Sequence, residues 1–173
     1  MRDEIETLYL TTYAAVVRFL YRKVWDEDRA EDLAQEVFVR AMRHRPEKPR
    51  AWVFAVAANL ARDEARSAIR RRKHLTLLTN EPTQRHQVEP VGEENLEHDE
   101  KMEKVRVALA ELSQRDRDVL LLWDAGLSYP EIAEQSGLAV GAVGTTLARA
   151  RKRLIEAHDR MEAERKRKHA AHS

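Results

Sequence analysis

Residues 51–73 constrain the fold more than any other stretch of this chain, because their side chains repeat at helical spacing on two different faces. One face is apolar and carries Val53, Val56, Ala57 and Leu60. Side chains three or four positions apart lie on the same side of an α-helix, so this face is expected to pack in a helical core. The chain is therefore predicted to be built from packed helices.

A polar stripe follows the neighbouring face of the same helix and ends in a cationic run. The stripe consists of Asn59, Arg62, Asp63, Arg66 and Arg70, and the run consists of Arg70, Arg71, Arg72 and Lys73. Consecutive cations on a helix repel one another unless an anion lies close by. The pattern therefore favours a surface that binds the phosphates of a nucleic acid.

The composition agrees with a helical DNA-binding protein, although the net charge is only +1. Of the 173 residues, 43% are hydrophobic and 35% are charged, with only 5 glycines and 5 prolines, which is typical of a mostly helical chain. Acidic side chains gather in residues 74–100, which hold seven Asp or Glu residues and one Arg. The rest of the chain is consequently basic on balance and can meet a polyanion.

Several other classes of protein are excluded or disfavoured. The lack of cysteine excludes a disulfide scaffold and a thiolate zinc site. No apolar run is long enough to span a membrane and the first residues do not resemble a signal peptide, so a cytoplasmic protein is expected. The histidines lack metal-ligand spacing, and no glycine-rich phosphate loop or serine elbow is present. Neither an enzyme nor a cofactor or metal site is expected.

Helical spacing predicts three helices within residues 1–73. The first spans residues 3–24. The second starts at Asp28, which has capping-box spacing to Glu31, and it ends before Pro46. Pro49 suits the first turn of the third helix. Short connections between them predict a compact three-helix bundle.

Residues 74–100 lose this periodicity and contain Pro82, Pro90 and Gly92. They are predicted to form an acidic, irregular linker without a fold of its own. Helical spacing returns at Met102, and a second helix covers residues 115–125 until Gly126 ends it.

A short helix, a tight turn and a longer helix follow. Ser128 and Glu131 form the predicted capping box of the short helix, Gly137 marks the turn, and the longer helix runs from Val140 through Arg153. This is the layout of a helix-turn-helix, whose second helix enters the major groove of DNA. Residues 159–173 form a basic tail that can continue this helix, and the tail is either merely solvated or makes a nonspecific contact with DNA or RNA.

Three stretches of the chain match the pattern of a known family. Residues 30–41 read AEDLAQEVFVRA, residues 50–66 read RAWVFAVAANLARDEAR, and residues 127–154 read LSYPEIAEQSGLAVGAVGTTLARARKRL. In this order they resemble the conserved regions two and four of bacterial sigma factors of the extracytoplasmic-function (ECF) type, in the sigma-70 superfamily. Three ordered motifs are a more specific signal than any one of them alone.

The resemblance implies an all-α protein with two small domains and the function of an RNA polymerase sigma factor, which directs promoter recognition, DNA opening and transcription initiation. Residues 1–73 would form the region 2 domain, which binds core polymerase and the minus-ten element. Residues 101–158 would form the region 4 helix-turn-helix domain, which binds the minus-thirty-five element. The implied partners are the beta and beta-prime subunits of core RNA polymerase, duplex promoter DNA and the melted non-template strand. Family members are commonly held inactive by an anti-sigma factor, which is a further candidate partner.

The resemblance also implies roles for residues of the first domain. The helix face with Asp32, Gln35 and Glu36 is expected to dock on the clamp of the largest polymerase subunit, and a merely solvated face is the alternative. Asn59 and Asp63 match positions that read unstacked promoter bases. Contacts to the DNA backbone are expected from Arg62, Arg66, Arg70, Arg71, Arg72 and Lys73. Phe54 is expected in the core, and Trp52 either in the core or stacked on a base.

The recognition helix departs from the family pattern. Members usually carry Thr-Val-Lys-Ser-Arg before a leucine, where this chain has Ala142, Val143, Gly144, Thr145 and Thr146. Base reading is therefore expected only from Thr145 and Thr146. Gly141 and Gly144 each cost about 1 kcal/mol relative to alanine, and they either let the helix approach DNA closely or belong to a protein-binding surface. Phosphate contacts are expected from Arg115, Arg149, Arg151, Lys152 and Arg153.

Two rival functions remain open at this point. One is a helix-turn-helix regulator that binds an operator without polymerase and needs a dimerising surface to read two half-sites. The other is a sigma-like decoy that binds only a protein and never directs initiation.

Overall fold

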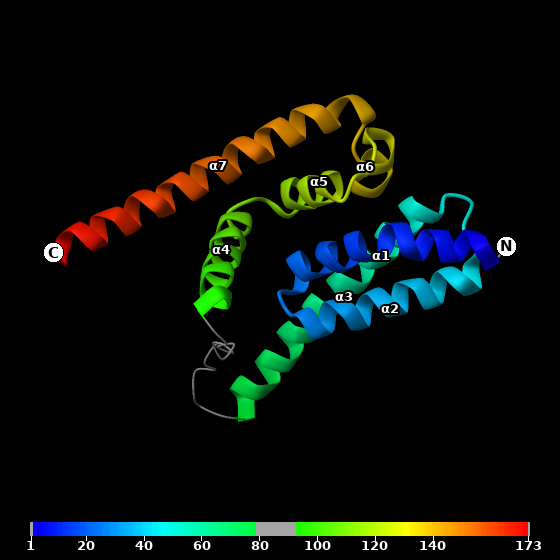
Figure 1. Ribbon diagram of the computed structural model, residues 1–173, viewed down its shortest axis with the longest axis horizontal. Helices are drawn as coiled ribbons and strands as arrows, with labels where there is room; N and C mark the ends of the chain where they lie inside the picture. The colour runs from blue at the N-terminus through cyan, green and yellow to red at the C-terminus, as the bar shows by residue number, and fades with distance from the viewer. Residues whose placement is uncertain (1, 79–92, 173) are drawn as a thin grey trace. The chain divides into compact units, whose positions relative to one another are not determined.

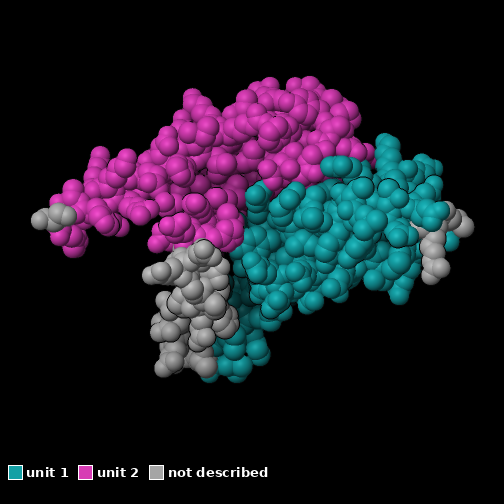
Figure 2. All heavy atoms as spheres, in the orientation of Figure 1, with its two compact units in different colours: residues 1–88 teal, residues 89–173 magenta. Residues whose placement is uncertain are grey.

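The computed structural model describes residues 2–78 and 93–172, and these residues form seven α-helices and no strand (Figure 1). The chain divides into two compact units, residues 1–88 and residues 89–173, which are coloured separately in Figure 2. This confirms the predicted all-α class and the predicted organisation into two small helical parts.

Unit 1 is the predicted three-helix bundle. It consists of α1 (Arg2–Val24), α2 (Glu27–His44) and α3 (Pro49–Leu78), and each helix packs against the other two (Figure 1). The rings of Phe19 and Phe54 meet edge to face with centroids 5.6 Å apart, and both side chains are buried. The other large buried side chains of this core are Val16, Leu20, Leu33, Val37, Phe38, Val53 and Leu60.

The start of α2 differs from the prediction. The N-cap is Asp26, whose carboxylate accepts a hydrogen bond from the backbone N–H of Arg29 at 2.8 Å, and not Asp28. The chain turns earlier than expected because Trp25 adopts a left-handed backbone with φ 55°. Asp28 therefore lies in the first helical turn, where its charge still complements the helix dipole.

Helices also extend into both ends of the segment predicted as irregular linker. α3 continues through residues 74–78, and α4 (Glu93–Ala110) begins well before Met102. The prolines and the glycine that motivated the prediction all lie in residues 79–92, outside the described residues. Glu97 and Glu100, in the part of α4 that precedes Met102, are good helix formers.

Unit 2 contains the predicted helix-turn-helix. α5 (Gln114–Asp124) precedes α6 (Tyr129–Ser136) and the recognition helix α7 (Val140–Ala171). The Ser128 hydroxyl accepts from the Glu131 N–H at 3.4 Å while the Glu131 carboxylate accepts from the Ser128 N–H at 2.8 Å, which confirms the capping box. Gly137 ends α6 with φ 69°, as the turn requires. The large buried side chains of this unit include Leu109, Leu112, Val119, Ile132, Val143 and Leu147.

The basic tail is not a separate segment, because α7 runs without a break to Ala171. Ala157 is fully buried, and the helix beyond it is tied to the preceding part of unit 2. Lys104 of α4 donates to Glu162 at 2.5 Å, and Arg160 forms an ion pair with Glu111. The first turns of the tail therefore belong to the fold of unit 2.

Candidate nucleic-acid interface

The polar stripe of α3 lies on the surface as predicted. Asn59, Arg62, Asp63, Arg66 and Arg70 are all exposed, whereas the opposite face of the same helix is buried as far as Ala61. The Asn59 side-chain oxygen accepts from Arg62 Nη1 at 3.1 Å, and Arg66 lies 4.0 Å from Asp63. Exposed contacts of this kind contribute little stability, so the side chains remain available for a ligand.

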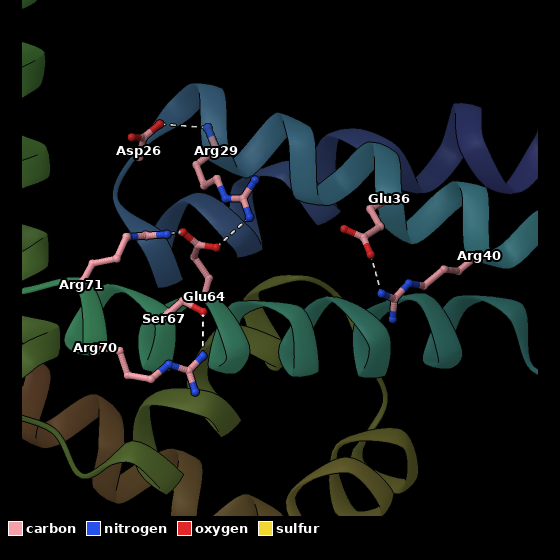
Figure 3. A network of polar contacts seen from close by, with 8 residues as sticks. All are labelled: Asp26, Arg29, Glu36, Arg40, Glu64, Ser67, Arg70 and Arg71. Atoms are coloured by element: carbon pink, nitrogen blue, oxygen red, sulfur yellow. Dashed lines mark hydrogen bonds and ion pairs between the residues drawn. The ribbon is translucent and has the colours of Figure 1, made fainter. Parts of the chain in front are cut away.

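A carboxylate that the sequence did not single out organises the basic end of this helix (Figure 3). Glu64 is only 15% exposed and accepts from Arg29 of α2 at 2.7 Å and from Arg71 at 3.2 Å. The hydrogen bond from Arg29 is the main cause that lowers the pKa of Glu64, and Arg71 contributes in the same direction. Glu64 and Arg71 are seven residues apart, which is about two turns on one helix face, so helical spacing contained this signal.

The four consecutive cations thus have different surroundings. Arg71 is directed to Glu64, and Arg70 donates to the Ser67 hydroxyl at 3.1 Å (Figure 3). Arg72 and Lys73 are exposed on the same stretch of α3. All four side chains keep exposed surface, and Arg71 also donates to the carboxylate that accepts from Arg29 of α2.

The two aromatic residues near the start of α3 differ in burial. Phe54 is fully buried, which confirms its predicted place in the core. Trp52 is half-buried, and its ring stacks on the ring of His44 with centroids 5.7 Å apart and an interplanar angle of 28°. The ring of Trp52 therefore lies at the edge of the core, and the alternative of stacking on a base stays a prediction.

The face of α2 with Asp32, Gln35 and Glu36 is exposed. Leu33, Ala34 and Val37 lie on the opposite, buried side, as helical spacing requires. Glu36 forms an ion pair with Arg40 one turn later. An acidic, amide-bearing surface is thus available to a basic partner.

In the recognition helix, the structure separates two neighbouring threonines that were predicted to act together. Thr145 is exposed, but Thr146 is only 5% exposed. The prediction that Thr146 reads bases is wrong, because Thr146 lies three residues after Val143 and four before Ala150, both of which are fully buried. Its side chain therefore belongs to the core of unit 2.

Two predicted phosphate-binding arginines are held by a buried carboxylate, Asp116, which is 1% exposed. Arg149 donates to Asp116 at 2.7 Å and Arg153 donates to it at 3.1 Å. The hydrogen bond from Arg149 is the main cause that lowers the pKa of Asp116. The arginine side chains remain 49% and 53% exposed, so each both stabilises the fold and presents charge to solvent.

The other predicted cations of unit 2 are exposed. The guanidinium carbon of Arg151 lies 3.9 Å from the ring centroid of Trp123, a cation–π geometry. Lys152 lies 4.0 Å from Glu156, and Arg115 stands in the first turn of α5. Within the described residues, no group of three or more His, Asp or Glu side chains is arranged to hold a metal ion, and no helix has the length and apolarity to cross a membrane.

Two family models match the two units. The model of sigma-70 region 2 matches residues 8–72, and the model of sigma-70 region 4 matches residues 102–154. RNA polymerase sigma factor YlaC of Bacillus subtilis is 31% identical over 166 residues, which cover 88% of this chain and 91% of the relative. ECF RNA polymerase sigma factor SigL of Mycobacterium tuberculosis is 34% identical over 151 residues, which cover 83% and 82%.

The chain belongs to the ECF family of RNA polymerase sigma factors. The fold of this sigma factor is also that of RpoE from Bartonella quintana, solved in complex with the anti-sigma factor NepR, with a TM-score of 0.66, 24% identity, and coverage of 91% and 97%. As a sigma factor, the protein binds core RNA polymerase and promoter DNA and directs transcription initiation. The family and the function expected from the sequence motifs are thereby confirmed.

Proposed function

We propose that unit 1 of this sigma factor binds core polymerase through α2 and holds the melted non-template strand of the minus-ten element on α3. The observation that carries this proposal is the continuous exposed stripe on α3, which begins opposite the buried residues of the first half of the helix and continues beyond them. Because bundle packing already occupies the apolar face, the polar face is free for a ligand. Asp32, Gln35 and Glu36 form the proposed polymerase contact.

The residue types on α3 suit separated DNA strands. Asn59 offers both a donor and an acceptor to the edge of an unstacked base, and Asp63 next to it adds acceptors. Arg62 and Arg66 provide charge for phosphates on either side, and Arg70, Arg71, Arg72 and Lys73 extend the cationic track along the helix. Capturing unstacked bases offsets part of the cost of opening the duplex.

We further propose that unit 2 binds the duplex at the minus-thirty-five element with α7 in the major groove. Thr145 faces the bases, and the exposed halves of Arg149 and Arg153 face phosphates. Asp116 fixes these two guanidinium groups before DNA binds, so less side-chain freedom is lost on binding. Arg115, Arg151 and Lys152 complete the proposed phosphate contacts.

Transcription in vitro with core polymerase on genomic fragments tests the proposal and identifies the promoter. On that promoter, Asn59→Ala and Arg66→Ala are expected to reduce strand opening, measured by reactivity of unpaired thymines. Arg18→Ala is the matched control, because Arg18 is an exposed arginine of α1 outside the stripe. Normal opening by both stripe variants would refute the assignment of α3.

The salt dependence of binding separates phosphate contacts from base contacts. Replacing both Arg72 and Lys73 with alanine is expected to reduce the slope of log affinity against log salt by about 0.7 per lost single-strand phosphate contact. Asn59→Ala is expected to lower affinity without changing this slope. Equal slopes for the double variant and the wild type would remove the two cations from the interface.

The same assays distinguish the two rival functions. An operator-binding regulator would bind duplex DNA without polymerase, and a decoy would bind polymerase without producing a transcript. We propose that the protein itself catalyses no reaction and acts in the cytoplasm, together with polymerase and promoter. Because a structurally similar sigma factor was solved with an anti-sigma factor, we also propose that such a protein restrains this chain, which co-purification from cells would test.

A further inference from the structure

Tyr129 lies over Gly144, a residue of the recognition helix that carries no side chain. It is the first residue of α6, and its side chain is 44% exposed. A Cβ atom placed on Gly144 of α7 would lie 3.5 Å from Tyr129 Cε2 and 3.9 Å from Tyr129 Oη. The phenol ring therefore stands beside the position from which a longer residue at 144 would extend.

Packing inside unit 2 does not explain the two glycines of this helix. A Cβ atom on Gly141 would meet nothing within 4 Å, and the distances at Gly144 are those of ordinary contact. Both residues lie inside α7, where glycine lowers helix stability relative to alanine. A residue that lowers helix stability without helping the fold is expected at a functional surface. Glycine has no side chain and therefore permits a ligand to approach the helix backbone closely.

The chemistry of this surface favours one kind of base. Within the described part of the chain, the Tyr129 hydroxyl has no hydrogen-bond partner in the protein. Residues 138–148 contain neither lysine nor arginine, so the side chains that most often read guanine are missing here. The phenol ring near Gly144 and the exposed Thr145 that follows it in the chain offer an apolar edge and hydroxyl groups, which suit the methyl group and the polar edge of a pair that contains thymine.

We propose that Tyr129 determines promoter specificity by reading a thymine at the base pair that faces Gly144. The ring edge contacts the thymine methyl group, and the hydroxyl bonds to the edge of the same base pair. Gly144 brings the helix backbone close enough to the groove for a side chain from α6 to reach it. This inference rests on the proposed binding of unit 2 to the upstream duplex.

The test uses holoenzyme made from the full chain and core polymerase, on the promoter found by transcription in vitro. Each base pair of the upstream element is changed in turn, and binding is measured by competition. Tyr129→Ala is expected to lose about fivefold or more of the discrimination at a single thymine position and to keep the preferences elsewhere. Tyr9→Phe is the control for the loss of a phenol hydroxyl group outside unit 2, because Tyr9 is 42% exposed and lies in unit 1.

A second variant separates DNA reading from a structural role. Gly144→Ala adds one methyl group that the fold accepts, so the melting temperature of unit 2 is expected to rise by about 3 °C. The same methyl group holds the helix away from the groove, so discrimination at the Tyr129 position is expected to fall. A purely structural role for Tyr129 predicts lower stability in Tyr129→Ala and an unchanged preference profile in both variants.

The binding profiles also separate failure of the role of Tyr129 from failure of the proposed binding of unit 2 to the upstream duplex. If wild-type holoenzyme shows no preference anywhere in the upstream element, the binding of unit 2 to that element fails, and the inference fails with it. If the wild type shows preferences and Tyr129→Ala keeps all of them, only the role of Tyr129 is overturned. If Tyr129→Ala and Gly144→Ala each lose discrimination at the same single thymine position, the result supports both the role of Tyr129 and the binding of unit 2 to the upstream element.

Discussion

Replacement of Asp116 by asparagine tests how much the buried carboxylate contributes to unit 2. Removing one partner of a fully buried ion pair costs about 3–5 kcal/mol. Arg149 and Arg153 are about half exposed, so water relieves part of that cost, and asparagine keeps one oxygen to accept a hydrogen bond. We therefore expect Asp116→Asn to lower the free energy of unfolding of unit 2 by about 2 kcal/mol.

Urea titration followed by Trp123 fluorescence measures this change in the full-length chain. Trp123 is the single tryptophan of unit 2, so Trp25→Phe and Trp52→Phe make it the only reporter. Asp159→Asn is the matched control, because its carboxylate is 72% exposed, and it is expected to change stability by less than about 0.5 kcal/mol. A loss below about 0.5 kcal/mol for Asp116→Asn would refute the argument that the two arginines depend on this charge.

The pH dependence gives an independent check with a defined sign. The folded state lowers the pKa of Asp116, chiefly through the hydrogen bond from Arg149. The stabilisation is therefore complete above the unfolded pKa of an aspartate, about 3.9, and is lost as the pH falls through the lower folded pKa. The difference between wild type and Asp116→Asn should stay constant from neutral pH down to about 5 and shrink only below about 4. A difference that already disappears near neutral pH would contradict this cause.

Three further changes follow from the contacts or backbone geometry of single residues, and urea titration measures each of them. Ser128→Ala removes the cap of α6 and should lower the stability of unit 2 by about 1 kcal/mol, while an unchanged midpoint would show that the cap contributes nothing. Gly137→Ala places a side chain at φ 69° and should cost about 1 kcal/mol, so equal stability would argue against a left-handed turn. Glu64→Gln weakens the contacts of Arg29 and Arg71 and should lower the stability of unit 1 by about 1 kcal/mol, as reported by its own tryptophans; no change would make this network dispensable.

The helices and their ends could be read from the sequence wherever the signal is local. The stripe on α3, the capping box of Ser128 and Glu131 and the turn at Gly137 each depend on residues within one or two turns of one another. The spacing of Thr146 from Val143 also implied that Thr146 is buried. The prediction that Thr146 reads bases was therefore a wrong interpretation of a signal that the sequence contained.

Boundaries were predicted less well where no strong stop signal was present. Composition suggested an irregular linker over residues 74–100, but the residues at both of its ends are helical. The N-cap of α2 is Asp26 and not the predicted Asp28, because the left-handed backbone of Trp25 turns the chain before Asp26. A left-handed conformation is uncommon at tryptophan, so the sequence contained no signal for this turn.

By itself, the sequence determined the helical class, the helix-turn-helix and the sigma-factor family, because periodicity and motif order are properties of the chain alone. Only the tertiary structure decided which charges stabilise the fold and which face solvent. Asp116 meets Arg149 across 33 residues, and Arg29 meets Glu64 across 35 residues. Such pairs form only when helices pack, and helical spacing within one segment carries no information about its partner in another.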